Sequence, residues 1–405
     1  MTVILPGCKY SILNDKCPIF NFQQKLPFIF AGLVVHIMTK TLSHLFCILL
    51  YISPVYTVVA QNNKSSFSES LSVSANVHYG FFVANQPKSQ YLRDSHTLFG
   101  EISILSQTRG TRAWQQQNHY PRIGMSILYG KTGSDEYLGN MAAILPFLDF
   151  PLLTTPHFNA HFRLGFGPGW IEKPYDPETN YKNFMIGTHL NACIHMSLKA
   201  EFPILKRLYL QTGFSFTHFS NGSVQLPNLG LNMPAITAGL RYAFGEPVKI
   251  VSDNQQAFKK KTHVYFFALA AAKQTYPLES PVYLVNIFNL EIAKDFSATG
   301  RFGAGINYAY DRSLSSEVIN APTYEFNKSK SHSQVGIYAS YEHVIGRLSI
   351  PLQFGVYVYN QYPVSSFFQN LGLRYRFANR WIGALQLKTH LGKADYFQWG
   401  IGYKF

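Results

Sequence analysis

The chain has 405 residues, a formal net charge of +14, and 16% aromatic against only 14% charged residues. Soluble globular domains carry about 25% charged residues, so this composition indicates a protein associated with a membrane. Beyond residue 60, however, no stretch reaches the roughly 18 uninterrupted apolar residues that a membrane-spanning helix needs. The composition therefore argues against both a soluble domain and a helical membrane protein.

The amino-terminal region has the pattern of an export signal. Lys40 precedes an apolar stretch over residues 45–59, which ends at the small residue Ala60. A positive start, an apolar centre and a small-residue end define a secretory signal peptide, so we expect cleavage after Ala60. Met38 is then the expected true start, and residues 1–37 an extension outside the fold. For an exported chain, the net charge of +14 suits anionic lipid headgroups, and we expect no nucleic acid partner.

Three of the four cysteines, Cys8, Cys17 and Cys47, precede this cleavage point. Cys193 would remain alone in the mature chain, so we expect no intramolecular disulfide. Cys47 lies inside the apolar stretch, without small residues before it, which argues against lipid attachment.

Alternation is the main signal of the remaining chain. From Val73 to Val83 every second residue is apolar, while polar residues and glycine occupy most of the other positions, and the pattern returns over 123–129 and 158–166. Period two is that of a β-strand whose faces meet different surroundings, and aromatic residues on the apolar face are typical of strands that contact lipid. We therefore predict an all-β, antiparallel transmembrane β-barrel protein in an outer membrane of the Gram-negative type.

The alternation predicts two sets of about eight strands, and an even number returns a barrel chain to the side where it began. Both sets close with an apolar strand that ends in phenylalanine, Phe244 and Phe405, and the polar segment 245–261 between them has the composition of a linker. We predict two tandem eight-stranded barrels, in residues 61–248 and 249–405, after an excluded segment 1–60. The expected strands are 72–84, 97–107, 121–130, 139–147, 158–170, 187–202, 207–220, 233–244, 263–273, 282–293, 301–310, 334–344, 348–359, 368–377, 380–390 and 395–405.

A single barrel of about sixteen strands is the alternative, and it would enclose a pore and suit a transporter. Four arginines distinguish the two architectures. In two small barrels they would meet polar or acidic partners in packed lumens, and in one large barrel they would line a wet channel. These residues are Arg163, Arg241, Arg374 and Arg376. Short turns near 345–347 and 378–379 and a long loop over 311–333 fit one short-turn and one long-loop end. The connection 108–120 is long, although it lies at the end where short turns are expected.

The candidate for chemistry is the segment Thr217-His218-Phe219-Ser220-Asn221-Gly222 at the end of a strand. His218 and Ser220 share the parity of Phe214 and Phe216, which places a histidine and a serine on the lipid face, where polar residues are rare and functional. Same-face neighbours on a strand are within about 7 Å, so the imidazole can act as general base to a serine nucleophile. The alternative is a pair of interfacial polar residues without chemistry.

At these residues the sequence resembles the lipid A 3-O-deacylase family (PagL type), whose pattern is His, any residue, Ser and Asn, followed by Pro-Asn and a carboxylate. The resemblance covers roughly residues 72–244. It implies that His218 is the base, that Ser220 is the nucleophile and that Asn221 helps to hold the oxyanion. Asn232 stands where the family has glutamate. A carboxylate stabilises the imidazolium, whereas a neutral amide only orients the ring, so this departure puts the rate in question.

The resemblance implies an outer-membrane esterase that removes an ester-linked acyl chain from lipid A, with lipopolysaccharide and membrane lipids as partners and no cofactor. The remaining alternative is a catalytically silent barrel that binds a partner through its loops. The first half also contains the acids Glu201, Asp176 and Glu178, but nothing in the sequence places any of them at the site. His390 occupies the corresponding strand end of the second half, but no serine follows and its parity is that of the lumen. We expect His78 and His161 to form hydrogen bonds in the lumen, since no His/Cys cluster has zinc spacing.

Overall fold

The structure is a computed structural model that describes residues 70–83, 87–245, 250–251, 258–314, 316, 332–361, 365–391 and 393–405. The predicted signal peptide, the start at Met38 and the cleavage after Ala60 lie outside the described residues, as does the larger part of the predicted linker. In the part of the chain that is described, no helix combines the length and apolarity needed to cross a bilayer.

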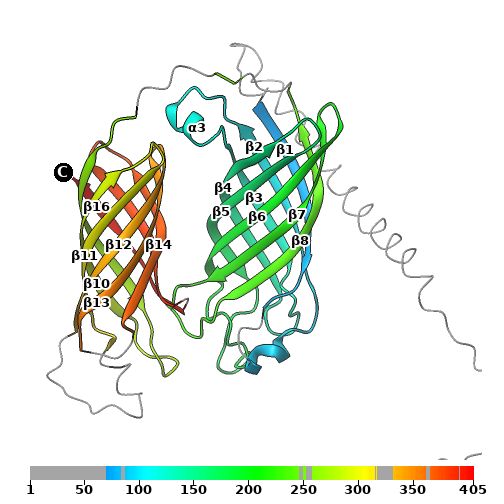
Figure 1. The fold of residues 1–405 in the computed structure, drawn as a ribbon. Helices are drawn as coiled ribbons and strands as arrows, with labels where there is room; N and C mark the ends of the chain where they lie inside the picture. Colours follow the sequence, from blue (N-terminus) through cyan, green and yellow to red (C-terminus); the bar gives the residue numbers. More distant parts are fainter. Residues whose placement is uncertain are drawn as a thin grey trace, which may run out of the picture. The chain divides into compact units, whose positions relative to one another are not determined.

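The first eight strands form a closed antiparallel barrel (Figure 1), in which each strand pairs with the next and β1 pairs with β8. Apolar and polar residues alternate along the strands because one face of each strand lines the lumen and the other faces outward. In β7, for example, Phe214 is 67% exposed and the adjacent Ser215 only 6%. The strands are β1 (Leu71–Gly80), β2 (Thr97–Gln107), β3 (Arg122–Lys131), β4 (Asn140–Thr154), β5 (Asn159–Ile171), β6 (Leu190–Leu205), β7 (Leu208–Ser220) and β8 (Leu231–Ala243).

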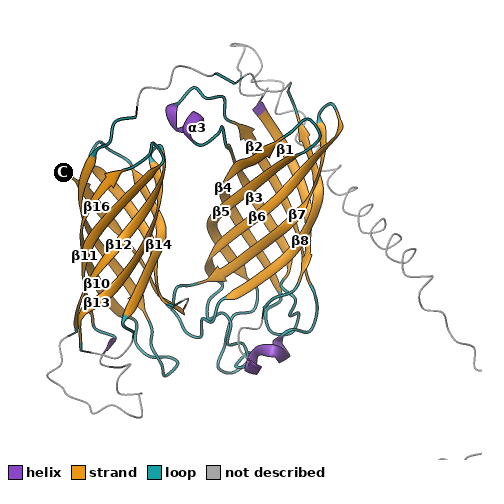
Figure 2. Ribbon diagram, in the orientation of Figure 1, coloured by secondary structure: helices purple, strands orange, loops and turns teal. Residues whose placement is uncertain are grey.

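The second eight strands form a closed antiparallel barrel of their own, completed where β16 pairs with β9. Figure 2 shows that strands make up nearly all the regular structure of the described residues, with only short helices such as η2 (Pro87–Leu92) and α3 (Ala113–Gln117). The strands are β9 (Thr262–Lys273), β10 (Tyr283–Asp295), β11 (Gly300–Asp311), β12 (Ser333–Ile345), β13 (Leu348–Asn360), β14 (Phe367–Arg376), β15 (Trp381–His390) and β16 (Lys393–Lys404).

Each barrel has one end with long connections, which we call the long-loop end, and one with mostly tight turns. In the first barrel the connections after β1, β3, β5 and β7 form the long-loop end. The connection between β2 and β3, at the opposite end, is the exception anticipated from its length, and it contains α3. Its one turn is fixed by Gln115, whose side chain accepts a hydrogen bond from the backbone N–H of Gly110 at 2.9 Å.

Several strand bounds differ from the prediction. β4 runs on to Thr154 and β6 to Leu205, because pairing with neighbouring strands continues beyond the clear alternation. At its other end β6 begins at Leu190, three residues later than predicted. β8 begins at Leu231, two residues earlier than predicted, since Leu231 and Asn232 pair with the end of β7. This last difference brings Asn232 into the sheet.

The lumen of the first barrel is filled by charged side chains in mutual contact. Glu101 accepts hydrogen bonds from Arg163 at 2.6 Å and Lys199 at 2.7 Å. Glu201, which lies nearer the end of the barrel with the tight turns, pairs with Arg122 at 2.8 Å and Arg241 at 3.1 Å. Each buried charge therefore has the opposite charge beside it, which offsets the large cost of removing both from water.

The second lumen repeats this arrangement with different residues. Arg374 donates to Glu291 at 2.8 Å, and Tyr338 and Gln353 donate to the same carboxylate at 3.0 Å each. Arg376, by contrast, is exposed near the end of β14, so it belongs to neither lumen. Two closed eight-stranded barrels with packed interiors are found, and the alternative of one sixteen-stranded pore is wrong.

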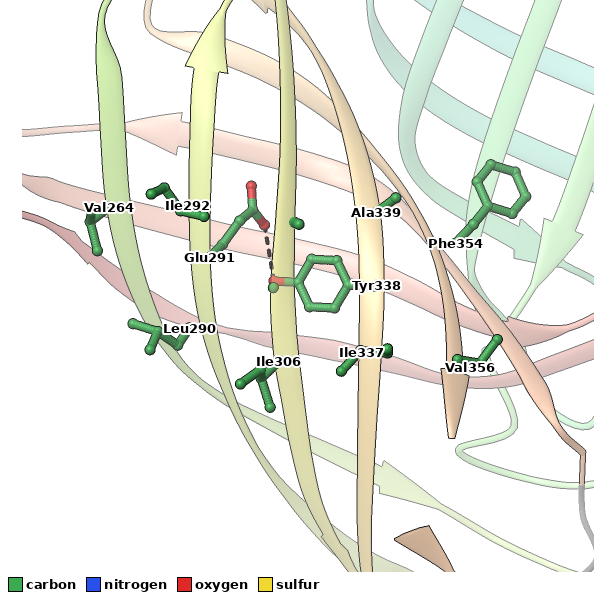
Figure 3. Close-up of a pocket in the computed structure, with 12 residues that line it drawn as sticks. Val264, Leu290, Glu291, Ile292, Ile306, Ile337, Tyr338, Ala339, Phe354 and Val356 are labelled. Atoms are coloured by element: carbon green, nitrogen blue, oxygen red, sulfur yellow. Dashed lines mark hydrogen bonds between the residues drawn. The ribbon is translucent and has the colours of Figure 1, made fainter. Parts of the chain in front are cut away.

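An apolar groove of about 710 Å³ lies along the second barrel (Figure 3). It forms where two small outward residues, Ala304 and Ala339, pair across β11 and β12 beside larger ones such as Ile306. Glu291 and Tyr338 also contribute to the lining, although both point to the lumen. Among its 12 lining residues there is no serine or histidine, so this groove offers no second copy of the candidate pair.

Candidate active site

The site lies at the long-loop end of the first barrel, where β7 and β8 pair. His218 stands directly opposite Asn232 in this pairing, and Phe219 stands opposite Leu231. Phe219 and Leu231 are fully buried in the core beneath, which fixes the backbone of both strands. His218 and Asn232 therefore project from a rigid part of the sheet, to its other face.

The imidazole of His218 is held by Asn232. Its Nδ1 atom lies 2.6 Å from Oδ1 of Asn232. Because an amide oxygen only accepts, Nδ1 carries the proton in this pair, and Nε2 is left with its lone pair. Asn232 thus selects the tautomer in which Nε2 can accept a proton, which a carboxylate in the same place would also do.

Ser220 ends β7, two residues after His218. It has the parity of the outward-facing residues, but only 3% of it is exposed, so the prediction that it faces lipid is wrong at this position. The reason is that the following loop folds over it: the backbone N–H of Gly222 donates to its Oγ at 3.1 Å and the Asn228 amide at 2.9 Å. The hydroxyl is thereby held by two donors.

No hydrogen bond joins His218 to Ser220 among the described residues. The predicted contact between base and nucleophile is therefore not made in this conformation, although both side chains come from the same strand end. Catalytic hydrogen bonds are often long in ligand-free enzymes and tighten when the substrate binds. The hydroxyl of Ser220 retains a proton to donate, because both of its observed contacts are ones in which it accepts.

Asn221 and Asn228, both in the loop after β7, form different hydrogen bonds. The Asn221 side-chain amide donates to Thr188 Oγ1, in the β5–β6 connection, at 3.1 Å and to the Gln225 carbonyl of its own loop at 2.8 Å, so both of its N–H groups are in use. Asn228 accepts a hydrogen bond from the Asn221 backbone N–H at 3.1 Å and points its own amide at Ser220. Asn228 rather than Asn221 therefore presents a donor beside the hydroxyl, and the Pro227-Asn228 pair in the sequence was its only signal.

Gly230 borders the imidazole on its other edge. It has a φ of +77°, and a Cβ atom placed on it would lie 2.8 Å from Cε1 of His218. Its backbone N–H donates to the Met185 carbonyl at 3.0 Å, which ties it to the connection between β5 and β6. Only glycine leaves the room that the ring occupies here.

The acids that the sequence left unplaced lie elsewhere. Glu201 is buried in the lumen with its arginines, and the Asp176 carboxylate accepts hydrogen bonds from Thr179 and Glu178 within its own loop. Asn232 is the polar partner that the structure gives to His218. The imidazole therefore has an orienting group but, among the residues that the structure describes, no negative charge in contact with it.

Three further histidines, His78, His161 and His390, lie in the lumens, as their parity predicted. His390 is 3.1 Å from Tyr357 Oη. His161 lies between the carboxylates of Asp149 and Glu201, but neither ring nitrogen has a hydrogen-bond partner among the described residues, so the predicted hydrogen bonds of His161 are not formed. His78 contacts Glu101 at 3.2 Å, and these two residues with His195 bring their ligand atoms within 4.8 Å of one another. Glu101 already binds two cationic side chains, so a metal ion there would meet strong repulsion.

Solved structures of low similarity include a KdgM porin (7% identity, TM-score 0.18, covering 82% of this chain and 99% of that one). A triple mutant of the Rhodopseudomonas blastica porin has 10% identity, a TM-score of 0.16 and coverages of 83% and 99%. The P. putida toluene transporter TodX has 8% identity, a TM-score of 0.15 and coverages of 83% and 90%. At these scores the likenesses carry no argument about function. No curated protein sequence matches the chain.

Two family models match the chain. Residues 261–405, which hold the second barrel, match the model described as "Acyloxyacyl hydrolase, C-terminal domain". Residues 100–241, which include His218, Ser220 and Asn232, match the model described as "Lipid A 3-O-deacylase (PagL)". The two matches together take in most of the chain, which therefore belongs to the lipid A 3-O-deacylase (PagL) family.

Proposed function

We propose that this protein is an outer-membrane lipid A deacylase that uses serine-esterase chemistry. The observation that carries the proposal is the arrangement of His218 at the barrel's long-loop end: its Nδ1 is bound by Asn232 and its neighbour Ser220 is held by two donors. Family membership supplies the substrate class, an ester of lipid A. The outward apolar faces of the strands support a place in the outer membrane, with the long-loop end in the leaflet that contains lipid A.

In the proposed reaction, Ser220 Oγ attacks the carbonyl carbon of an ester-linked acyl chain while its proton passes to Nε2 of His218. The carbonyl oxygen becomes negative, and donors must lie where that charge develops. The Asn228 amide and the Gly222 N–H, which already point at Oγ, are the groups best placed to serve after a small shift of the loop. Asn221 then acts mainly by bracing this loop.

The tetrahedral intermediate collapses when the sugar oxygen leaves and takes the proton from His218. An acyl group remains on Ser220. Water, deprotonated by His218, then attacks this ester, and the acyl group leaves as a fatty acid while Ser220 Oγ takes the proton back from His218. The imidazolium forms twice in this cycle without a carboxylate beside it. We therefore expect slow turnover, since an amide in this position orients the ring but does not neutralise it.

Covalent labelling tests the serine-esterase step. A fluorophosphonate carrying a long alkyl chain should react with the folded protein in detergent, and peptide mass spectrometry should find the adduct on Ser220. The Ser220→Ala chain should remain unlabelled, and His218→Ala should label at a strongly reduced rate. A folded wild-type chain that resists labelling would leave the barrel as a silent binding protein, and an adduct on another residue would contradict the role of Ser220 as nucleophile.

A further inference from the structure

A polar cavity of about 590 Å³ opens at the long-loop end of the first barrel, between the connections β3–β4 and β5–β6. The reaction proposed above does not use it. Three tyrosine rings, two ammonium groups and an imidazole contribute to its lining. These side chains belong to Tyr137, Tyr175, Tyr181, Lys173, Lys182 and His189.

Hydrogen bonds across the cavity and within its β5–β6 wall hold it open. The Asn180 side chain donates to the carbonyls of Tyr137 at 3.0 Å and Pro174 at 2.7 Å, and Asn183 donates to the carbonyl of Lys173 at 2.8 Å. Asn183 is fully buried, so its bond is shielded from water. A cavity formed before its ligand arrives avoids much of the ordering cost of binding.

The cations of the cavity keep free hydrogen-bonding capacity. Lys173 donates to the backbone carbonyl of Asp135 at 2.6 Å, and the Lys182 ammonium lies 6.0 Å from the centre of the Tyr137 ring. In the described part of the chain neither lysine forms an ion pair. The carboxylate of Asp176 in the lining is occupied by N–H groups of its own turn, and Glu136 is the other acid there. Ammonium groups of this kind suit phosphate oxygens.

The same wall of the cavity is bonded to the candidate active site. Thr188, adjacent to the lining residue His189, accepts the hydrogen bond from Asn221 at 3.1 Å. Met185, in the same connection, accepts one from Gly230, which borders His218. A ligand in the cavity is therefore held by the segment that also braces Ser220 and His218.

We propose that this cavity binds a phosphorylated sugar of the lipid A headgroup and so positions the ester for Ser220. Tyrosine rings suit the C–H face of a sugar, and the lysines suit its phosphate. In lipid A the sugar, its phosphate and the ester-linked acyl chains belong to one molecule. The inference rests on the proposed function, but binding can be measured without turnover.

The first test is calorimetric titration of the full Ser220→Ala chain in detergent micelles with the bisphosphorylated glucosamine disaccharide, freed of all acyl chains. The unaltered cavity should bind it, and Lys182→Ala or Tyr181→Ala should raise the Kd by at least about tenfold. Both side chains are exposed, so the fold should persist. Lys131→Ala is the matched control, because Lys131 is exposed at the same end, bonded to Asp135, and outside the lining.

The unphosphorylated disaccharide and inorganic phosphate should each bind more weakly than the phosphorylated sugar. Equal binding of phosphate alone, no binding of the disaccharide, or an equal effect of Lys131→Ala would overturn the proposal. In the active chain, Lys182→Ala should raise KM for lipid A, and Lys131→Ala should leave it unchanged. Absence of any Ser220-dependent hydrolysis would instead contradict the proposed function, while the titration would still report on the cavity.

Discussion

Nδ1 of His218 lies 2.6 Å from Oδ1 of Asn232, directly across the pairing of β7 with β8. The geometry is that of a base and its orienting partner, but the partner is neutral. Asn232 therefore orients the ring but supplies no charge, whereas a glutamate would do both. The proposed turnover is expected to be limited by the missing charge and not by the position of the ring.

Replacing Asn232 by glutamate should restore that charge. We expect Asn232→Glu to raise kcat for lipid A deacylation by at least about tenfold with little change in KM, because the carboxylate stabilises the imidazolium only as it forms. Rates of fatty acid release from purified lipid A measure this. Asn232→Gln keeps an amide and should give no gain, and a glutamate variant no faster than wild type would show that charge does not limit the reaction.

Gly230 is expected to be intolerant of any side chain. A methyl group in Gly230→Ala would push the His218 ring, and displacements of about 1 Å in an active site can cost about 100-fold in rate. Gly133→Ala is a matched control, since Gly133 also has a positive φ (+95°) but its Cβ would approach Thr97 and Ser95. Both variants should lose similar stability on unfolding in urea, while only Gly230→Ala should lose activity. Equal loss of activity would argue for a general loop effect.

Asn228 should matter through its donor. Asn228→Asp keeps the oxygen that accepts from Asn221 but removes the N–H beside Ser220, and loss of one oxyanion donor typically lowers kcat by about 100- to 1,000-fold. Asn221→Asp removes donors that serve only Thr188 and Gln225, so its effect on kcat should be smaller. The kcat values of the two variants give the comparison, with circular dichroism to verify that each barrel is folded. A larger loss of kcat in Asn221→Asp than in Asn228→Asp would return the oxyanion role to Asn221.

The charged lumen should control stability rather than chemistry. Glu201→Gln leaves Arg122 and Arg241 without their shared carboxylate, and breaking a buried pair costs about 3–5 kcal/mol. Urea unfolding in detergent should show this loss, whereas Glu178→Gln in an exposed loop should change the unfolding free energy by less than about 0.5 kcal/mol. A stable Glu201→Gln barrel would mean that water in the lumen compensates for the lost charge.

The fold was predictable because each strand carries its own signal. Alternation such as that of Phe214 and Ser215 identifies the two faces, and the polar break after Phe244 separates the two barrels. Strand ends were less predictable, since pairing extends β8 back to Leu231 through residues without clear alternation. That extension is what places Asn232 opposite His218.

The sequence indicates candidate residues for the site but not the contacts that they make. His218, Ser220 and Asn232 follow a spaced motif that the sequence displays. The burial of Ser220 and the role of Asn228 depend on how the loop after β7 folds back, which no periodicity records. The cavity near His189 was missed for the same reason: its lining comes from two connections that only the closed barrel brings together.

Mass spectrometry of lipid A from cells that express this chain tests the central claim most directly, with the Ser220→Ala variant as the comparison. The account predicts loss of one ester-linked acyl chain in cells with the wild-type protein and intact lipid A in cells with the variant, with both proteins folded in the outer membrane. Unchanged lipid A in both, with the wild-type barrel correctly folded, would contradict the proposal that the protein is a deacylase.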